Sequence, residues 1–179
     1  MTDLPIRLAT IADEAEILAL CRELHAENGL FPMSDERVMQ MLSTCFDRKG
    51  GIIGLVGAPG GVQAVMFLKL ANHWYSEEWF LEELFSYVRP EHRKTTHAKR
   101  LVDWAKHMAD DLGLPALIGI ISLDRTEAKV RLYRRQLGNP AGAFFLYRPA
   151  ACKLGVESPP RADWWREPKR VRAGAAAKH

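Results

Sequence analysis

A cluster of cations at a predicted helix start is the most unusual chemical feature of the sequence. Residues 86–101 read SYVRPEHRKTTHAKRL, where a predicted strand ends and a predicted helix begins, and they contain Arg93, Lys94, Lys99 and Arg100. A helix N-terminus carries about half a positive charge and several unpaired backbone N–H groups, so cations there are unfavourable unless an anion is bound. The pattern indicates an anion site, with cations turned into solvent as the alternative interpretation.

Two adjacent carboxylates and a tyrosine are candidates for acid–base chemistry. Glu82 and Glu83 lie in the predicted strand 80–88 (FLEELFSYV), and neighbouring strand residues point to opposite faces, so only one can face a given cleft. A charged residue in a central strand is costly unless it is paired or exposed. Tyr133 lies on the apolar face of a predicted helix at 126–138, where core packing is the alternative to a catalytic role.

Other polar groups give weaker signals. The segment NHWYSEEW at residues 72–79 combines acids and aromatic rings that would suit an ammonium-bearing substrate, although a solvent-exposed hairpin loop is the more common explanation for such a segment. His92, His97 and His107 do not share one helix face, and we assign no metal site.

The elements that must position these residues follow from hydrophobic periodicity and from turn signals. The order β-α-α-β-β-β-α-β-α-β indicates an α/β fold with a mixed sheet. A continuous apolar run at 116–122 predicts a strand that is buried on both faces. We expect Ser34 to cap the second predicted helix and Gly113 to end the third. The predicted strands are 5–10, 51–58, 62–71, 80–88, 116–122 and 142–148, and the predicted helices are 9–29, 34–47, 98–112 and 126–138.

Composition limits the classes of protein to consider. The chain has 179 residues, 47% of them hydrophobic, and a net charge of +3, which fits one compact domain at residues 1–150 followed by a basic Pro/Arg/Ala-rich tail at 151–179. Much of the positive charge lies in that tail, so a nucleic-acid surface on the folded part is not favoured. Cys21, Cys45 and Cys152 suggest neither disulfides nor zinc. No apolar run is long enough to span a membrane, and we expect a cytoplasmic protein.

Two stretches carry a family resemblance. VRPEHRKTTHAKRL is similar to the pattern V-x-P-x-x-R-x-x-G-x-G/A, and LYRRQLG is similar to L-Y-x-x-x-G. Together with the order of elements, these motifs resemble the GNAT superfamily of acyl-CoA-dependent N-acetyltransferases, over residues 6–147. The matching residues are Val88, Pro90, Arg93 and Ala98 in the first motif, and Leu132, Tyr133, Leu137 and Gly138 in the second.

The resemblance implies a fold and a set of roles. It implies a mixed sheet of about six or seven strands flanked by about four helices, and acetyl-CoA as cosubstrate. Tyr133 would donate a proton to the CoA sulfur, and Glu83 or Glu82 would act as base, with Glu83 slightly favoured. The residues implied in cofactor binding, mainly around the pyrophosphate, are Val88, Arg93, Lys94, Thr95, Thr96, His97 and Ala98.

The leading hypothesis is therefore an N-acetyltransferase that moves an acetyl group to a primary amine by direct attack in a ternary complex. The acceptor would be a small molecule or a peptide, and a homodimer is possible. A non-catalytic module that binds acyl-CoA or a partner is the alternative, because Thr96 stands where the family usually has its first glycine. Nucleic-acid binding through Arg131, Arg134 and Arg135 is a third reading, which a solvated helix face explains more simply.

Overall fold

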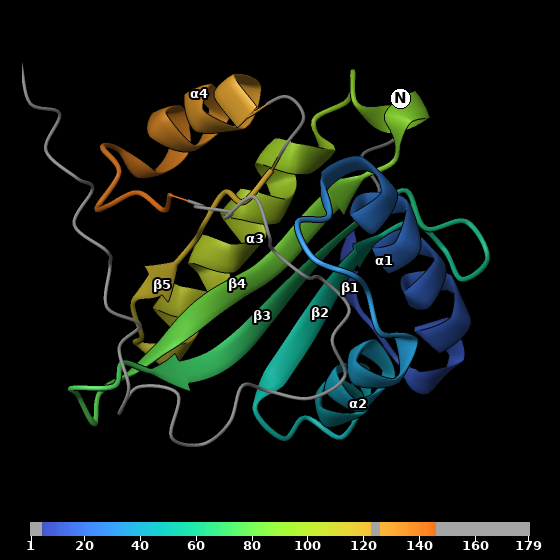
Figure 1. Cartoon of the computed structure of the whole chain (residues 1–179), viewed down its shortest axis with the longest axis horizontal. Coiled ribbons are helices and arrows are strands. Elements are labelled where there is room, and N and C mark those ends of the chain that lie inside the picture. The colour runs from blue at the N-terminus through green and yellow to red at the C-terminus, as the bar shows by residue number, and fades with distance from the viewer. Residues whose placement is uncertain (1–4, 123–125, 146–179) are drawn as a thin grey trace, which may run out of the picture. The chain divides into compact units, whose positions relative to one another are not determined.

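The computed structural model describes residues 5–122 and 126–145, which fall within one compact unit, residues 1–146. Its core is a five-stranded sheet with the order β1-β2-β3-β4-β5 (Figure 1). The α/β class and the GNAT-like order of elements are confirmed for this part of the chain. The elements are β1 (Ile6–Leu8), α1 (Glu14–Asn28), α2 (Asp35–Phe46), β2 (Gly51–Val56), β3 (Ala64–Asn72), β4 (Trp79–Val88), α3 (His97–Leu112), β5 (Ala116–Leu117) and α4 (Thr126–Leu137), with short 3₁₀ turns at Ile11–Asp13 and Pro90–His92.

Alternate residues of the strands build two cores. On one face, Val65 and Phe67 of β3 pack with residues of α1 and α2. On the other face, Met66 and Leu68 pack with Leu101 and its neighbours in α3. This period of two is the expected signature of a sheet that is covered on both faces. Figure 1 shows α3 crossing behind the sheet, and α4 packs against α3.

Local signals set the helix ends as the sequence predicts. Ser34 caps α2, since its hydroxyl accepts a hydrogen bond from the Arg37 backbone N–H at 3.3 Å. Gly113 ends α3 with φ of 65°, a left-handed conformation that favours glycine. Both predictions are confirmed.

The central strand β4 contains a β-bulge. Phe85 pairs with Phe67 of β3, but Glu83 pairs with Leu68, so Leu84 is an extra residue without a partner in the ladder. An extra residue resets the alternation of side chains along the strand. Side chains before and after Leu84 therefore do not follow a simple odd–even rule.

Backbone hydrogen bonds confirm that the alternation changes. The Leu81 N–H donates to the Pro115 carbonyl at 2.9 Å, on the β5 side of the strand. The Arg89 N–H donates to the Gln63 carbonyl at 3.0 Å, on the β3 side. Two residues separated by an even number of positions would point the same way in a regular strand, so the bulge at Leu84 accounts for the reversal.

Two strand predictions need correction. The predicted buried strand 116–122 is a strand only at Ala116–Leu117, and both of these residues are exposed. The reason is its position: β5 lies at the edge of the described sheet and pairs with β4 through only two residue pairs. Residues 142–145 of the last predicted strand pair with no described strand, so the described sheet has five strands rather than six or seven.

Some expectations cannot be compared with the structure. The remainder of the last predicted strand, at 146–148, and the predicted tail at 151–179 lie outside the described residues. No helix within the described ranges is both long and apolar enough to cross a membrane. In the same ranges no group of His, Cys, Asp and Glu side chains is arranged to hold a metal ion.

Candidate active site

A hydrogen-bonded cluster joins the middle of β4 to α4. The Tyr133 hydroxyl donates to Glu83 Oε1 at 3.2 Å, and the Ser86 hydroxyl lies 3.2 Å from the same Tyr133 oxygen. Glu83 and Ser86 are three positions apart and would face opposite ways in a regular strand. The bulge at Leu84 places both on the α4 side, where they reach one tyrosine.

The structure separates the two adjacent glutamates. Glu83 lies with Tyr133, whereas Glu82 pairs in register with Lys69 of β3 and so belongs to the opposite face of the sheet. The sequence-level expectation that they point in opposite directions is confirmed. The arrangement brings together the favoured candidate base and the candidate acid.

Burial changes the acid–base properties of both groups. Burial raises the pKa of Glu83, although hydrogen bonds from Ser86, Tyr133 and the Gly119 backbone and the charge of Lys129 act in the other direction. Burial also raises the pKa of Tyr133 well above its usual value, and the neighbouring Glu83 charge raises it further. Glu83 is therefore a stronger base than an exposed glutamate, and Tyr133 stays protonated at neutral pH.

A cavity of about 240 Å³ opens between the end of β4, the start of α3, the end of α1 and α4. Ser86, Leu132 and Lys129 line it on the side of the Tyr133–Glu83 pair. The Lys129 ammonium donates to the Ser122 hydroxyl at 2.9 Å, and that hydroxyl donates to Asn28 Oδ1 at 2.7 Å. Lys129 and Asn28 both line the cavity, which lies next to the candidate acid and base.

One edge of β4 faces this cavity without a described neighbouring strand. Because the Arg89 N–H points toward β3, the backbone groups of Ser86 and Val88 point the other way, beyond the two-residue pairing with β5. The Arg93 Nε group donates to the Val88 carbonyl at 3.1 Å. An extended, amide-bearing ligand could therefore add to this edge as a strand would.

The structure brings only part of the predicted cofactor stretch to the cavity. Val88, Arg93, Thr95 and Ala98 line it. Lys94, Thr96 and His97 do not, although their backbones belong to the same turn. The stretch as a whole remains a prediction for cofactor binding.

Two side chains of the stretch are used inside the protein. The Thr95 hydroxyl donates to the His92 carbonyl at 2.6 Å and accepts from the His97 N–H at 3.3 Å, so it binds the first backbone N–H of α3. The buried His97 ring lies 2.8 Å from Gln63 Oε1 and is not among the residues that line the cavity.

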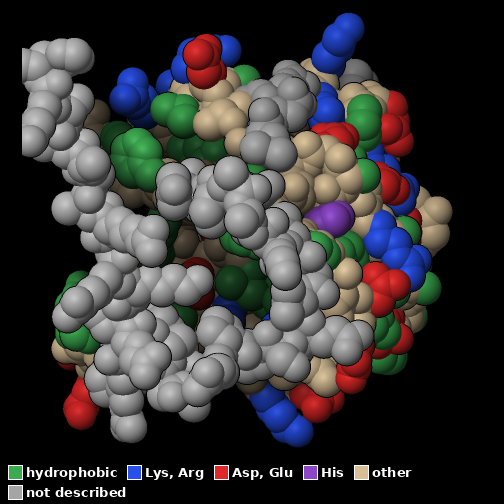
Figure 2. Space-filling model, viewed as in Figure 1, with side chains coloured by type: hydrophobic (Ala, Val, Ile, Leu, Met, Phe, Trp, Pro, Cys, Tyr) green, Lys and Arg blue, Asp and Glu red, His purple; other side chains and the backbone are tan. Residues whose placement is uncertain are grey.

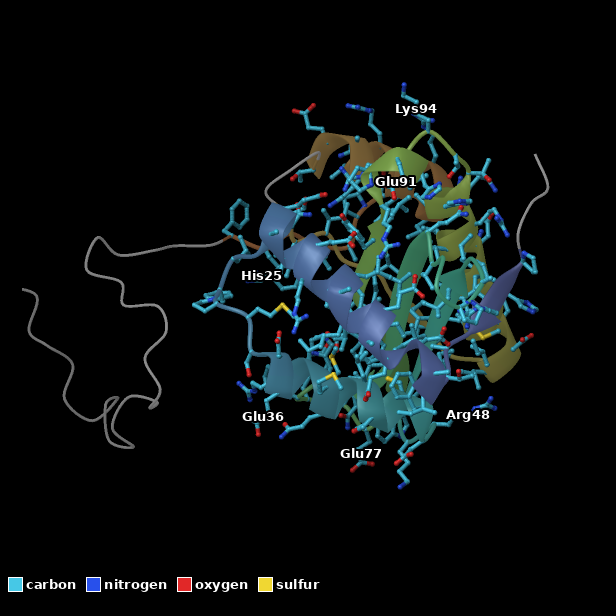
Figure 3. All side chains as sticks on the ribbon, turned by 90° about the vertical axis from the view of Figure 1, so that its right-hand side faces the viewer. His25, Glu36, Arg48, Glu77, Glu91 and Lys94 are labelled. Atoms are coloured by element: carbon cyan, nitrogen blue, oxygen red, sulfur yellow. The ribbon has the colours of Figure 1, made fainter. Side chains whose placement is uncertain are left out.

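The cations at the helix start have different partners. Arg93 forms an ion pair with Glu27 of α1 at 2.6 Å, and Lys99 pairs with Asp103 one turn along α3. Lys94 is exposed, points away from the body of the protein in Figure 3, and has no ion-pair partner among residues 5–122 and 126–145. Of these three, Lys94 is the cation that remains available to an incoming anion.

Sequence reasoning did not identify Lys129 as part of the site, whereas Glu27 and Asn28 belong to the segment ENGLFPM at residues 27–33, which the family resemblance implies as a wall of the acceptor site. Lys129 lies one turn before Tyr133 on α4, so helical spacing places both on the same face. That spacing could have identified Lys129 as a residue near the Tyr133 hydroxyl. Nothing in the local sequence of Glu27 or Asn28 shows that the end of α1 approaches the end of β4.

Comparison with known proteins identifies the fold and the family. A model described as the acetyltransferase (GNAT) family matches residues 18–138. No curated protein sequence matches the chain.

Solved structures share the fold at low sequence identity. The structure of AAC(6')-Iy in complex with the bisubstrate analog CoA-S-monomethyl-acetylneamine has a TM-score of 0.65 at 12% identity, over 83% of this chain and 99% of that one. A predicted acetyltransferase with acetyl-CoA from Clostridium acetobutylicum has a TM-score of 0.65 at 12% identity, over 81% and 96%. The aminoglycoside antibiotic 6'-N-acetyltransferase AAC(6')-Ih from Acinetobacter baumannii has a TM-score of 0.62 at 13% identity, over 82% and 97%.

Proposed function

Because the chain belongs to the GNAT acetyltransferase family, whose members use acetyl-CoA, we propose that it transfers the acetyl group of acetyl-CoA to a primary amine by direct attack in a ternary complex. The observation that carries this proposal is the Tyr133–Glu83 hydrogen bond of 3.2 Å beside the cavity. Acetyl transfer from a thioester to an amine needs a proton acceptor for the amine and a proton donor for the departing thiolate, and Glu83 and Tyr133 can supply the two roles.

The two side chains have complementary tasks in this reaction. Glu83 accepts the proton that the amine nitrogen loses as that nitrogen forms a bond to the thioester carbonyl carbon. Tyr133 gives its proton to the sulfur as the carbon–sulfur bond breaks, and it regains a proton from Glu83 through their shared hydrogen bond. Atoms and charge balance: the products are an amide and CoA with a free thiol, and both side chains return to their starting states.

The surroundings of the cavity fit an acyl-CoA. The open edge of β4 at Ser86 and Val88 would bind the amide-bearing arm of CoA. The turn from Arg93 to Ala98, at the N-terminus of α3, would bind the pyrophosphate through backbone N–H groups, with Lys94 nearby. The solved relatives that contain acetyl-CoA or a CoA-linked bisubstrate analog support this assignment.

We propose a small-molecule amine as the acceptor. One structural relative is named as an aminoglycoside antibiotic 6'-N-acetyltransferase, and another, AAC(6')-Iy, is in complex with the bisubstrate analog CoA-S-monomethyl-acetylneamine; both support the small-molecule class. The same reaction would also acetylate the amine of a peptide.

A non-catalytic acyl-CoA-binding module is the second candidate. The observation that favours it is the turn before α3, where Thr96 stands in place of the family's first glycine and the Thr95 hydroxyl already binds the His97 N–H. This module would bind acetyl-CoA but would not transfer its acetyl group.

Turnover distinguishes the two candidates. The protein is incubated with acetyl-CoA and a panel of aminoglycosides, polyamines, amino acids and peptides, and acetylated products are detected by mass spectrometry. Under our proposal at least one amine is acetylated, and Tyr133→Phe reduces the rate by about 100-fold or more. CoA binding by calorimetry without any acetylated product across the panel would support the module instead.

A further inference from the structure

The Arg93 side chain joins three parts of the protein. One of its Nη atoms lies 2.6 Å from both Glu27 carboxylate oxygens, and its Nε donates to the Val88 carbonyl at 3.1 Å. Its guanidinium carbon lies 5.6 Å from the centre of the Tyr87 ring. Arg93 therefore links the end of α1 and the end of β4 to the turn that leads into α3.

Glu27 is the point on which these contacts converge. It accepts a hydrogen bond from the Tyr87 hydroxyl at 3.0 Å in addition to those from Arg93. Burial and the contact with Glu27 raise the pKa of Tyr87 to about 12. The Arg93 and Glu27 side chains are 22% and 27% exposed, so their attraction is less screened than that of a surface pair.

The same pattern recurs along one face of α1. Arg89 lies 3.9 Å from Glu16 and 3.3 Å from Glu23, while Arg93 pairs with Glu27. Acidic and basic side chains are interspersed on this side of the molecule in Figure 2. The arginines at the junction between β4 and α3 are therefore held by the acidic face of α1.

We propose that Glu27 is a positioning residue for acyl-CoA: it holds Arg93 so that the turn from Arg93 to Ala98 is fixed in the shape that binds the pyrophosphate. This inference rests on the proposed function, because it assumes that the cavity binds CoA. Arg93 then acts through its contacts with Glu27 and Val88 rather than as a direct phosphate ligand. Glu27 is assigned to the CoA site although it lies on a different element.

The expected effect follows from the geometry. Backbone N–H groups bind an anion well only if the turn that carries them is already ordered, since ordering it on binding costs conformational entropy. Removal of the Glu27 charge leaves Arg93 with one fewer anchor and loosens the turn. A lost charge-assisted hydrogen bond corresponds to a roughly tenfold weaker affinity for CoA.

A double-mutant cycle separates positioning from direct contact. The affinity of the full-length protein for CoA is measured by calorimetry for wild type, Glu27→Gln, Arg93→Gln and the double variant. If Arg93 acts through Glu27, each single change weakens binding about tenfold and the double change weakens it no further. If Arg93 contacts the phosphates directly, the two effects multiply, and the inference is wrong.

The control is Glu23→Gln, a change of the same type on the same helix. Glu23 contacts Arg89 and does not line the cavity, so CoA affinity should stay within about twofold of wild type. Unliganded melting temperatures identify variants that fold poorly. If Arg93→Gln does not fold, Arg93→Lys replaces it, because lysine keeps the charge but cannot hold Glu27 and Val88 together.

Kinetics supply a second readout. Once an amine acceptor has been identified, the steady-state kinetics of the variant can be measured. Glu27→Gln should raise the KM for acetyl-CoA about tenfold and leave kcat within about twofold of wild type, because Glu27 does not touch the reacting atoms. A large fall in kcat without a change in CoA affinity contradicts the positioning role. If wild-type protein fails to bind CoA, the proposed function itself fails; if wild type binds CoA and Glu27→Gln binds equally well, only the present inference fails.

Discussion

Replacement of Glu83 by glutamine tests the acid–base assignment at one atom. Glutamine has nearly the same shape, and its amide oxygen can still accept the Tyr133 hydrogen bond, but it cannot take a proton from the amine. Loss of a general base costs about 100- to 10,000-fold in rate, which is about 3–5 kcal/mol in the activation barrier. Glu83 is not among the cavity-lining residues, so CoA affinity should be nearly unchanged.

Glu83→Gln should lower the reaction rate but raise the stability of the protein. The pKa of Glu83 is raised in the folded protein, so between its unfolded and folded pKa values the native state binds more protons than the unfolded state. Stability from this group is therefore present below the unfolded pKa and is lost as pH rises through the folded pKa. Glu83→Gln should raise the melting temperature above this window and have little effect below it.

The assay follows CoA release against pH, with Glu82→Gln as the matched control. Glu82 lies on the opposite face, in register with Lys69, and its loss should change the rate by less than about threefold. The wild-type rate should fall on acidification with a midpoint above the ordinary pKa of glutamate, and this acid limb should vanish in Glu83→Gln. A Glu83→Gln protein with wild-type rate and an unchanged acid limb would refute the assignment.

Three further substitutions test Tyr133, Lys129 and the turn at Gly57. Tyr133→Phe should lower kcat by about 100-fold with little change in CoA affinity by calorimetry, and equal losses in the two would point to a packing role. Lys129→Met should move the acid limb to higher pH because it removes a charge that lowers the pKa of Glu83, while Lys129→Arg should leave the limb in place; identical profiles would exclude the electrostatic role. Gly57→Ala should destabilise the fold by about 1–3 kcal/mol in urea unfolding, because φ is 116° and a Cβ would lie 2.3 Å from the Gly61 carbonyl oxygen; an unchanged midpoint would show that the turn relaxes.

Local chemistry made much of the fold predictable. The Ser34 cap, the Gly113 stop and the hydrophobic period of α3 are each encoded within a few residues, and the structure has them where the sequence predicts. The apolar run at 116–122 led to the wrong prediction of a long buried strand, because apolar character does not show how many strands pair with a segment. Leu117 is exposed because β5 ends after two residues at the edge of the described sheet.

The site was predictable only where it follows a motif. Tyr133 and Glu83 were both candidates, and the structure places them in contact. The contribution of Ser86 was not predictable, because it depends on the bulge at Leu84, which is a property of strand pairing rather than of the residue itself. The ion pair between Glu27 and Arg93 joins residues 66 positions apart, and only the tertiary fold shows it.

The cations at the start of α3 have a more specific interpretation once their partners are known. Arg93 and Lys99 are compensated by Glu27 and Asp103 within the protein. An internal counter-charge removes most of the penalty for a cation near a helix N-terminus. The argument for an anion at this junction therefore depends on Lys94 and the backbone N–H groups more than on the number of cations.

A crystal structure of the protein with acetyl-CoA is the most direct test of the account. We expect the arm of CoA along the open edge of β4 at Ser86 and Val88, the pyrophosphate at the turn before α3, and the thioester sulfur within hydrogen-bonding distance of the Tyr133 hydroxyl. Acetyl-CoA bound elsewhere, or bound in this cavity with its sulfur remote from Tyr133 and Glu83, would contradict the proposed acetyl transfer.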